Sequence, residues 1–191
     1  MGKYFEVRWH GRGGQGTVTG AKSLAEAVQG TGKFVIAFPE YGPERRGAPL
    51  RAFNRFADCQ IRVHTPVKSP AVVIIVDPTL IGHPSLVEGL TDETIFIVNT
   101  EKSAAETKKI LGLTTQKLFT VPANRISHEL FKREIPNSAM MGAFAKACPN
   151  VISVDKLVEE SRHIFEEILG KDLVERNLEA VKRGAIEGDV A

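Results

Sequence analysis

The sequence predicts an α/β fold in three layers, with helices on both faces of a mostly parallel, mixed sheet, one β-hairpin and a helical C-terminal third. Two continuous apolar segments, residues 71–76 and 94–98, are typical of strands that are covered on both faces. Near the N-terminus, an alternating apolar segment runs into a glycine cluster and then into helical spacing, which indicates the start of a β-α-β unit. After residue 125, the apolar residues recur at helical spacing.

The N-terminal segment, residues 4–29, predicts a strand, a glycine turn and a helix. Its glycines fit the pattern G-x-G-x-x-G at Gly11, Gly13 and Gly16. In this arrangement the backbone N–H groups at the start of the helix face outward and can hold an anion. Tight turns also use glycine clusters, so the pattern is consistent both with a phosphate site and with a purely structural turn.

The next segments predict the mixed character of the sheet. Residues 30–32 end the helix, and residues 33–38 form a strand that completes the β-α-β unit. Residues 39–49 contain three prolines and two glycines and predict an irregular loop beside the glycine turn, at the carboxyl edge of the sheet. Residues 50–56 and 60–63 alternate and predict a β-hairpin, where a dinucleotide-binding fold would have a crossover helix.

The rest of the chain predicts alternating strands and helices, then helices alone. Strands are expected at residues 71–76, 94–98 and 117–121, and helices at residues 86–90, 103–111, 126–131, 140–147, 153–168 and 173–186. Ser103 is the expected N-cap of its helix, with Glu106 as its reciprocal partner. Residues 188–191 are expected to be frayed. By length the chain is one domain, with an α/β part (residues 1–150) and a helical extension of it (residues 151–191).

Composition excludes several functional classes. The net charge of +2 and the 7% of aromatic residues provide no basic, aromatic surface for nucleic acid. No apolar run approaches the ~20 residues of a membrane span, and early charges argue against a signal peptide, so we expect a cytoplasmic protein. The two cysteines, Cys59 and Cys148, are expected to be reduced and mostly buried. Two thiolates cannot by themselves hold a cubane iron–sulfur cluster.

No catalytic set emerges from the sequence. The histidines lack metal-ligand spacing, and no nucleophile motif occurs, so we expect neither a catalytic residue nor a metal site in this chain. His10 precedes the glycine turn, but a structural role is expected for it. Asp77 ends a strand at the same edge and, before Pro78, is consistent with a turn cap. Glu40 is not a convincing ribose-binding acid because it follows a proline within an irregular loop.

The loop of residues 41–51 has two interpretations. Arg45, Arg46 and Arg51 together could clamp a diphosphate or a carboxylate, which suits the guanidinium group. The same arginines could instead be solvated, pair with neighbouring glutamates or contact a subunit, and the interface version of this second interpretation is slightly favoured.

Three motifs together resemble a known family. W-H-G-R-G-G-Q-G at residues 9–16, A-F-P-E-Y-G-P-E-R-R-G-A-P at residues 37–49 and I-P-N at residues 135–137 are similar to the gamma subunit of pyruvate/2-oxoacid:ferredoxin oxidoreductases, the pyruvate synthase family. Gly47-Ala48 replaces the usual Gly-Gly, which is a mild departure. The resemblance covers essentially the whole chain.

The resemblance implies one subunit of a multi-subunit enzyme. The family converts a 2-oxo acid, coenzyme A and oxidised ferredoxin to acyl-CoA, carbon dioxide and reduced ferredoxin. It implies alpha, beta and delta partner subunits, with thiamine diphosphate and Mg²⁺ in the alpha and beta subunits and [4Fe-4S] clusters in the beta and delta subunits. No cofactor is expected on this chain alone, and the isolated chain is expected to be inactive. Pyruvate is the default substrate, with branched-chain 2-oxo acids and 2-oxoglutarate as alternatives.

The resemblance also suggests a role for the glycine turn. In single-chain members the equivalent domain is thought to help hold coenzyme A, and the matching positions here lie in the turn and the next loop. The candidate contacts to the phosphates of coenzyme A are Gly13, Gly14, Gln15, Gly16, Thr17, Arg45 and Arg46. The alternatives are a structural subunit whose turn and basic loop only dock neighbours and, disfavoured, a stand-alone nucleotide-binding oxidoreductase.

Overall fold

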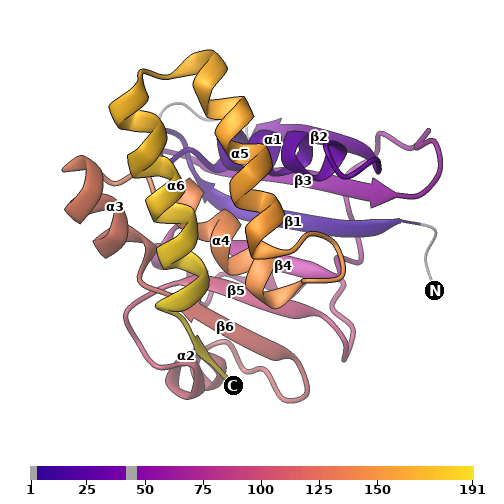
Figure 1. Ribbon diagram of the computed structural model, residues 1–191. Coiled ribbons are helices and arrows are strands. Elements are labelled where there is room, and N and C mark those ends of the chain that lie inside the picture. The colour runs from indigo at the N-terminus through magenta and orange to yellow at the C-terminus, as the bar shows by residue number, and fades with distance from the viewer. Residues whose placement is uncertain (1–3, 42–46) are drawn as a thin grey trace.

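The computed structural model describes residues 4–41 and 47–191, and within them a seven-stranded sheet forms the centre of the molecule (Figure 1). The strand order is β2-β3-β1-β4-β5-β6-β7. β3 and β7 run against the direction that the other five strands share, so the sheet is mixed, as predicted. The strands are β1 (Phe5–Arg12), β2 (Phe34–Tyr41), β3 (Pro49–Ala57), β4 (Val72–Ile75), β5 (Ile95–Asn99), β6 (Lys117–Val121) and β7 (Asp189–Val190).

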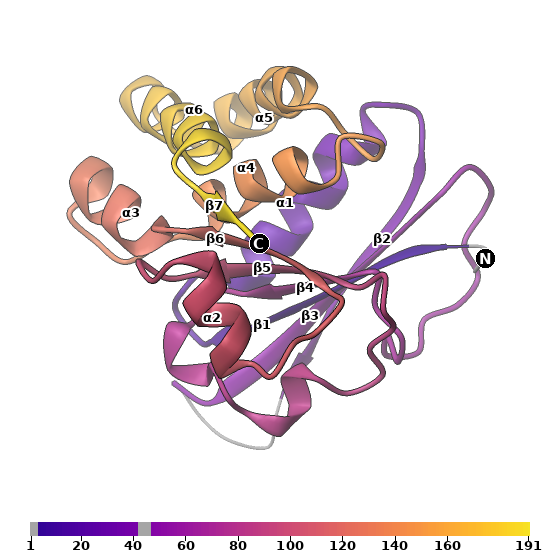
Figure 2. The same cartoon turned by 90° about the horizontal axis from the view of Figure 1, so that it is seen from below.

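Helices cover the two faces of the sheet unequally. Figure 2 shows α1, α4, α5 and α6 above the sheet and α2 below it. The helices are α1 (Thr17–Gln29), α2 (Ala104–Ile110), α3 (Ala123–Phe131), α4 (Asn137–Ala147), α5 (Val154–Ile168) and α6 (Lys171–Ile186), and two short 3₁₀ turns are η1 (Pro78–Leu80) and η2 (Pro84–Leu86). The larger apolar core lies under α1 and α4, and a smaller one lies between the other face, η1, η2 and α2. The predicted three-layer α/β fold is therefore confirmed.

The central helix α4 is mostly apolar because every residue from 138 to 145 is buried. It lies between the sheet and α6, and two glycines allow the close approach of the two helices. A Cβ atom on Gly142 would lie 1.9 Å from the carbonyl oxygen of Val181, and one on Gly184 would lie 2.0 Å from that of Ala139. No helix in the part of the chain that the structure describes is long and apolar enough to cross a membrane.

The predicted hairpin has the wrong partner strand. β3 pairs antiparallel with β2, and residues 60–63 form no strand. β2 and β1 run in the same direction, as a β-α-β unit requires, but β3 lies between them. The reason is that β2 pairs with β3 along its whole length, through apolar contacts such as Phe38 opposite Phe53 and through the ion pair of Glu40 with Arg51. Residues 60–63 are instead tied to the sheet through the carbonyl of Val63, which accepts a hydrogen bond from Arg55.

The end of the chain is also different from the prediction. Residues 188–191 are not frayed, because β7 pairs antiparallel with β6 and the backbones of Leu118 and Ala191 exchange two hydrogen bonds. The Asp189 carboxylate accepts a hydrogen bond from the backbone of Ala104, at the start of α2. The helix predicted at residues 86–90 is only the short turn η2, which begins earlier. The N-cap of α2 is Ser103, as predicted.

The two cysteines differ in their environment. Cys148 is buried, and this burial raises its pKa to about 12, so the thiol stays protonated at neutral pH. Cys59 is exposed, so the prediction of burial is wrong for this residue. It directly follows β3, in the segment that was wrongly predicted to be the turn of the hairpin.

The contact between α4 and α6 gives a first prediction. Gly184→Ala should destabilise the chain by about 1–3 kcal/mol, because the added methyl group would collide with backbone that cannot move independently. Chemical denaturation of both proteins measures this difference. The control is Glu179→Ala at an exposed position of the same helix, which should stay within about 0.5 kcal/mol of the parent. Equal stability of the two variants would show that the helices are not in tight contact.

Candidate functional site

The glycine turn joins the end of β1 to the start of α1. Gly14 and Gly16 have φ values of 101° and 77°, a left-handed conformation that favours glycine. The side-chain oxygen of Gln15 closes the turn by accepting a hydrogen bond from the backbone of Arg12 (2.9 Å). Gly16 is the N-cap of α1 and offers no capping side chain, and the first turn contains no acidic residue. The first N–H groups of α1 therefore have neither an intrahelical acceptor nor a capping oxygen.

A second helix begins beside this turn. The Asn137 side chain, at the start of α4, packs so closely on Gly16 that a Cβ atom there would lie 3.0 Å from the Asn137 Cγ atom. Thr17 is buried, and among the described residues its hydroxyl group has no hydrogen-bond partner. That hydroxyl would lie 2.1 Å from a Cβ atom on Gly11, which explains why glycine is needed there. Two of the three motifs that carry the family resemblance thus meet at this point.

Arg12 connects the turn to two other loops. Its guanidinium pairs with Asp77 (Nε to Oδ2, 2.8 Å), donates to the Thr79 hydroxyl (3.3 Å) and donates to the Gly47 carbonyl (3.0 Å). Asp77 also caps η1 by accepting a hydrogen bond from the backbone of Thr79, as the sequence suggested. The glycine turn, η1 and the chain directly before β3 therefore form one edge of the molecule.

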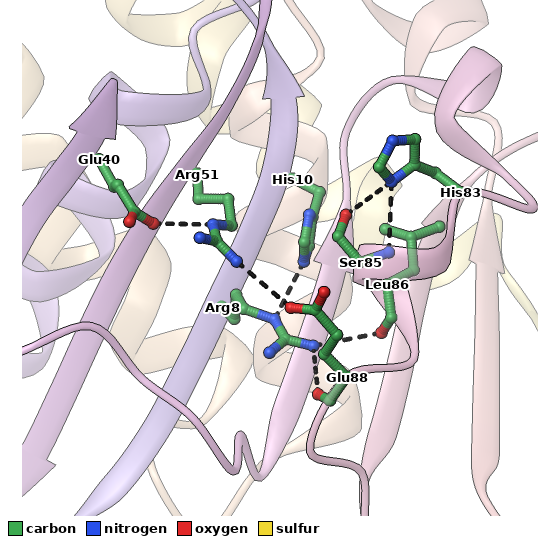
Figure 3. Close-up of polar contacts among 8 residues, drawn as sticks. All are labelled: Arg8, His10, Glu40, Arg51, His83, Ser85, Leu86 and Glu88. Carbon is green, nitrogen blue, oxygen red and sulfur yellow. Dashed lines mark hydrogen bonds and ion pairs between the residues drawn. The ribbon is translucent and has the colours of Figure 1, made fainter. Parts of the chain in front are cut away.

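A cavity of about 440 Å³ opens beside this edge, on the sheet face opposite α1. Figure 3 shows its polar groups, which come from β1, β2, β3 and the segment around η2. The lining residues are His10, Glu40, Pro49, Leu50, Arg51, Leu80, His83, Ser85, Leu86 and Glu88. Arg51 lies in the cavity wall between two glutamates. Its Nε atom is 2.7 Å from a Glu40 oxygen, and its Nη1 atom is 3.6 Å from a Glu88 oxygen.

A buried arginine–histidine pair forms the floor of this region. Arg8 is 1% exposed and His10 is 3% exposed. Arg8 Nε donates to His10 Nε2 (3.0 Å), and Arg8 Nη2 donates to the backbone carbonyls of Leu86 and Glu88. Since arginine only donates, His10 Nε2 must carry a lone pair, and the ring is neutral with its proton on Nδ1. Burial, with help from the Arg8 and Arg51 charges, lowers the pKa of His10 to about 3.

The structure brings only some of the predicted site residues together. Gly13, Gly14, Gln15, Gly16 and Thr17 share the turn, next to the cavity but not in its lining. Arg45 and Arg46 lie outside the described residues.

Glu40 and Arg51, which flank the undescribed part of the predicted loop, pair with each other. Sequence reasoning missed Arg8, His83, Ser85 and Glu88. For Arg8 a signal was available, because the polar residues of β1 alternate and therefore share one face of the sheet with Arg8: Glu6, His10 and Arg12.

Comparison with known proteins agrees with the three motifs. A family model described as pyruvate ferredoxin/flavodoxin oxidoreductase matches residues 6–187. The chain belongs to this family. It is 41% identical over 182 residues to the pyruvate synthase subunit PorC of Thermotoga maritima, covering 95% of this chain and 93% of that protein. It is 45% identical over 166 residues to the common gamma subunit of the pyruvate/ketoisovalerate oxidoreductases of Pyrococcus furiosus, covering 87% of this chain and 89% of that protein.

A solved structure extends the match to the fold of the whole chain. The crystal structure of the pyruvate oxidoreductase subunit PORC from Thermotoga maritima superposes with a TM-score of 0.86 at 37% sequence identity, and the match covers 100% of this chain and 99% of that one. Sequence and fold thus agree along the full length of gamma-type subunits of the pyruvate ferredoxin/flavodoxin oxidoreductase family.

The buried pair gives a prediction for pH dependence. The folded pKa of His10, about 3, lies below its ordinary value of 6.5, so the unfolded chain takes up a proton first as the pH falls. Above pH 6.5 His10 is mostly neutral in both the folded and the unfolded chain, so the folded state keeps its full stability. As the pH falls from 6.5 toward 3, only the unfolded chain binds the proton, and the free energy of unfolding decreases. His10→Gln keeps an acceptor for Arg8 but does not titrate. Between pH 7 and pH 5 the parent should therefore lose about 2 kcal/mol more stability than this variant.

Urea denaturation at the two pH values measures this loss. The control is His163→Gln at an exposed position of α5, which should keep the pH dependence of the parent. If His10→Gln and the parent lost equal stability, His10 would not be held neutral by its surroundings.

Proposed function

We propose that this chain is the gamma subunit of a pyruvate (2-oxoacid):ferredoxin oxidoreductase and that the edge around its glycine turn helps to bind coenzyme A. In this proposal the Gly13–Thr17 backbone, Arg45 and Arg46 contact phosphate groups of coenzyme A. The enzyme oxidatively decarboxylates a 2-oxo acid with coenzyme A to give acyl-CoA, carbon dioxide and reduced ferredoxin. The subunit also contributes to assembly of the complex.

The position of Arg12 is the strongest support for this proposal. Through the Gly47 carbonyl, Arg12 attaches the end of the segment that contains Arg45 and Arg46 to the glycine turn. The glycine turn and Gly47, the first described residue after this segment, therefore lie at one edge of the sheet. The N-terminus of α1 supports anion binding there, because its N–H groups point outward and no acidic side chain competes in the first turn.

The rest of the enzyme would supply the redox chemistry. Thiamine diphosphate with Mg²⁺ and the [4Fe-4S] clusters are assigned to the alpha, beta and delta subunits, and ferredoxin reaches the complex through them. Among the described residues, no group of three His, Cys, Asp or Glu side chains could hold a metal ion. Pyruvate is the proposed substrate because the Thermotoga relative is named for it, and the Pyrococcus relative is shared by a pyruvate and a ketoisovalerate enzyme. Substrate choice is therefore assigned to other subunits.

The second candidate is a purely structural subunit that docks its neighbours. The pairing of Arg51 with Glu40 and Glu88 favours it, since those charges are satisfied within the chain and leave less for a ligand. Under this alternative, the glycine turn and the basic loop would be contact surfaces.

The two candidates differ in their kinetics. Replacing Arg45 and Arg46 together by alanine in the assembled oxidoreductase should raise the KM for coenzyme A roughly 100-fold or more, because each lost charge-assisted contact costs about 1.5–3 kcal/mol. The KM for the 2-oxo acid should not change. The matched control is Lys108→Ala with Lys109→Ala, which removes two positive charges from α2. An unchanged KM for coenzyme A in a fully assembled enzyme would favour the structural alternative.

A further inference from the structure

The strand β2 leaves one edge of the sheet open. Among the strands that the structure describes, it pairs only with β3, and Figure 2 shows it at the end of the sheet away from β7. Its residues 34–38 read F-V-I-A-F, without a charge, and each is at least partly exposed. The residues opposite them in β3, by contrast, are buried. An edge of this kind carries unpaired N–H and C=O groups and accepts another strand easily.

The opposite edge of the sheet is protected. β7 has two residues and begins with Asp189. Short, charged edge strands are a common means of preventing association between sheets. β2 has eight residues, and its protective residues, Pro39 and Glu40, both lie beyond the apolar segment. The two edges therefore differ in a way that favours pairing at β2.

Both faces of the open strand are apolar. Val35 and Ala37 pack against the core under the helices. Phe34, Ile36 and Phe38 point to the other face, where the Phe38 ring lies 5.2 Å from the Phe53 ring and the Phe34 side chain is 48% exposed. A strand added at this edge must match apolar residues on both faces at once.

We propose that a second copy of this chain pairs with β2 in antiparallel orientation, centred on Ile36, so that the two sheets become one. In this register Ile36 lies opposite Ile36 of the second copy, Phe34 lies opposite Phe38, and Val35 lies opposite Ala37. Every apolar side chain of the segment meets an apolar side chain on the same face. Pro39, which cannot donate a hydrogen bond, falls outside the paired segment.

The symmetry of this match favours a second copy as the occupant. A two-fold interface uses the same patch on both subunits, so the patch must be complementary to itself. The segment satisfies this condition because all five of its residues are apolar, and reversing its direction therefore brings no charge opposite an apolar residue. The interface uses neither the glycine turn nor the cavity residue Glu40, so it is independent of the proposed binding of coenzyme A.

Disulfide crosslinking of the full chain tests both the partner and the register. In a Cys59→Ser background, which removes the exposed thiol, Ile36→Cys would place two thiols directly opposite each other, with Cβ atoms about 4.5–5.5 Å apart. Mild oxidation should then give a covalent dimer. The matched control is Phe34→Cys, whose two copies would lie roughly 14 Å apart along the strands and should not crosslink. Equal crosslinking of both variants, or crosslinking of neither, would overturn the proposal.

The oligomeric state gives a second readout. Sedimentation of the parent chain should show a dimer, and Ile36→Lys should shift it to a monomer with an unchanged far-UV spectrum. Ile168→Lys, at a side chain that is 66% exposed on α5, should remain a dimer. A monomeric parent chain, or a dimer that Ile168→Lys dissociates and Ile36→Lys does not, would contradict the inference. Neither measurement involves coenzyme A, so its failure would leave the proposed function unaffected.

Discussion

The position of α1 on the sheet depends on one buried amide. The Asn54 side chain lies between β3 and α1, accepting a hydrogen bond from the Trp9 indole (2.7 Å) and donating one to the Ala21 carbonyl (2.7 Å). Trp9 and Asn54 are both fully buried, so these bonds form without competition from water. Gly20 lets the helix approach the Trp9 ring closely. Because β1, β3 and α1 are joined at this amide, the direction in which α1 leaves the glycine turn is determined.

The insertion of β3 between β1 and β2 has a functional consequence. A hairpin next to β1 brings the start of β3 to the same edge as the end of β1, so Arg12 can reach the Gly47 carbonyl. In a doubly wound fold with adjacent parallel strands, a crossover helix would separate these segments. The same insertion leaves β2 at the edge of the sheet, where its apolar segment has no second neighbouring strand among the described residues. One topological feature thus accounts both for the edge that the glycine turn shares with the start of β3 and for the proposed contact between two copies.

Local patterns predicted the elements well and their partners poorly. The apolar segments that became β4, β5 and β6, and the Ser103 cap of α2, could be read from the sequence because they depend on neighbouring residues. The pairing of β2 with β3 depends on contacts between two separate segments, and the sequence contained two possible partners for β3, residues 33–38 and residues 60–63. The buried Arg8–His10 pair was missed because its stability comes from carbonyl groups of residues about eighty positions later. The glycine turn was predicted, but the contact of Asn137 with it was not, since it joins two distant helix starts.

The proposed binding of coenzyme A requires that the turn at the start of α1 faces this ligand in the assembled oxidoreductase. Amide hydrogen exchange of residues 13–19, with and without coenzyme A, is the sharpest test, because the first N–H groups of α1 lack acceptors within the helix. Exchange at these amides should slow when coenzyme A binds, and should slow likewise with 3′,5′-ADP, which carries phosphates without the thiol arm. Unchanged exchange in this segment, alongside protection by coenzyme A in the other subunits, would show that the turn does not contact coenzyme A.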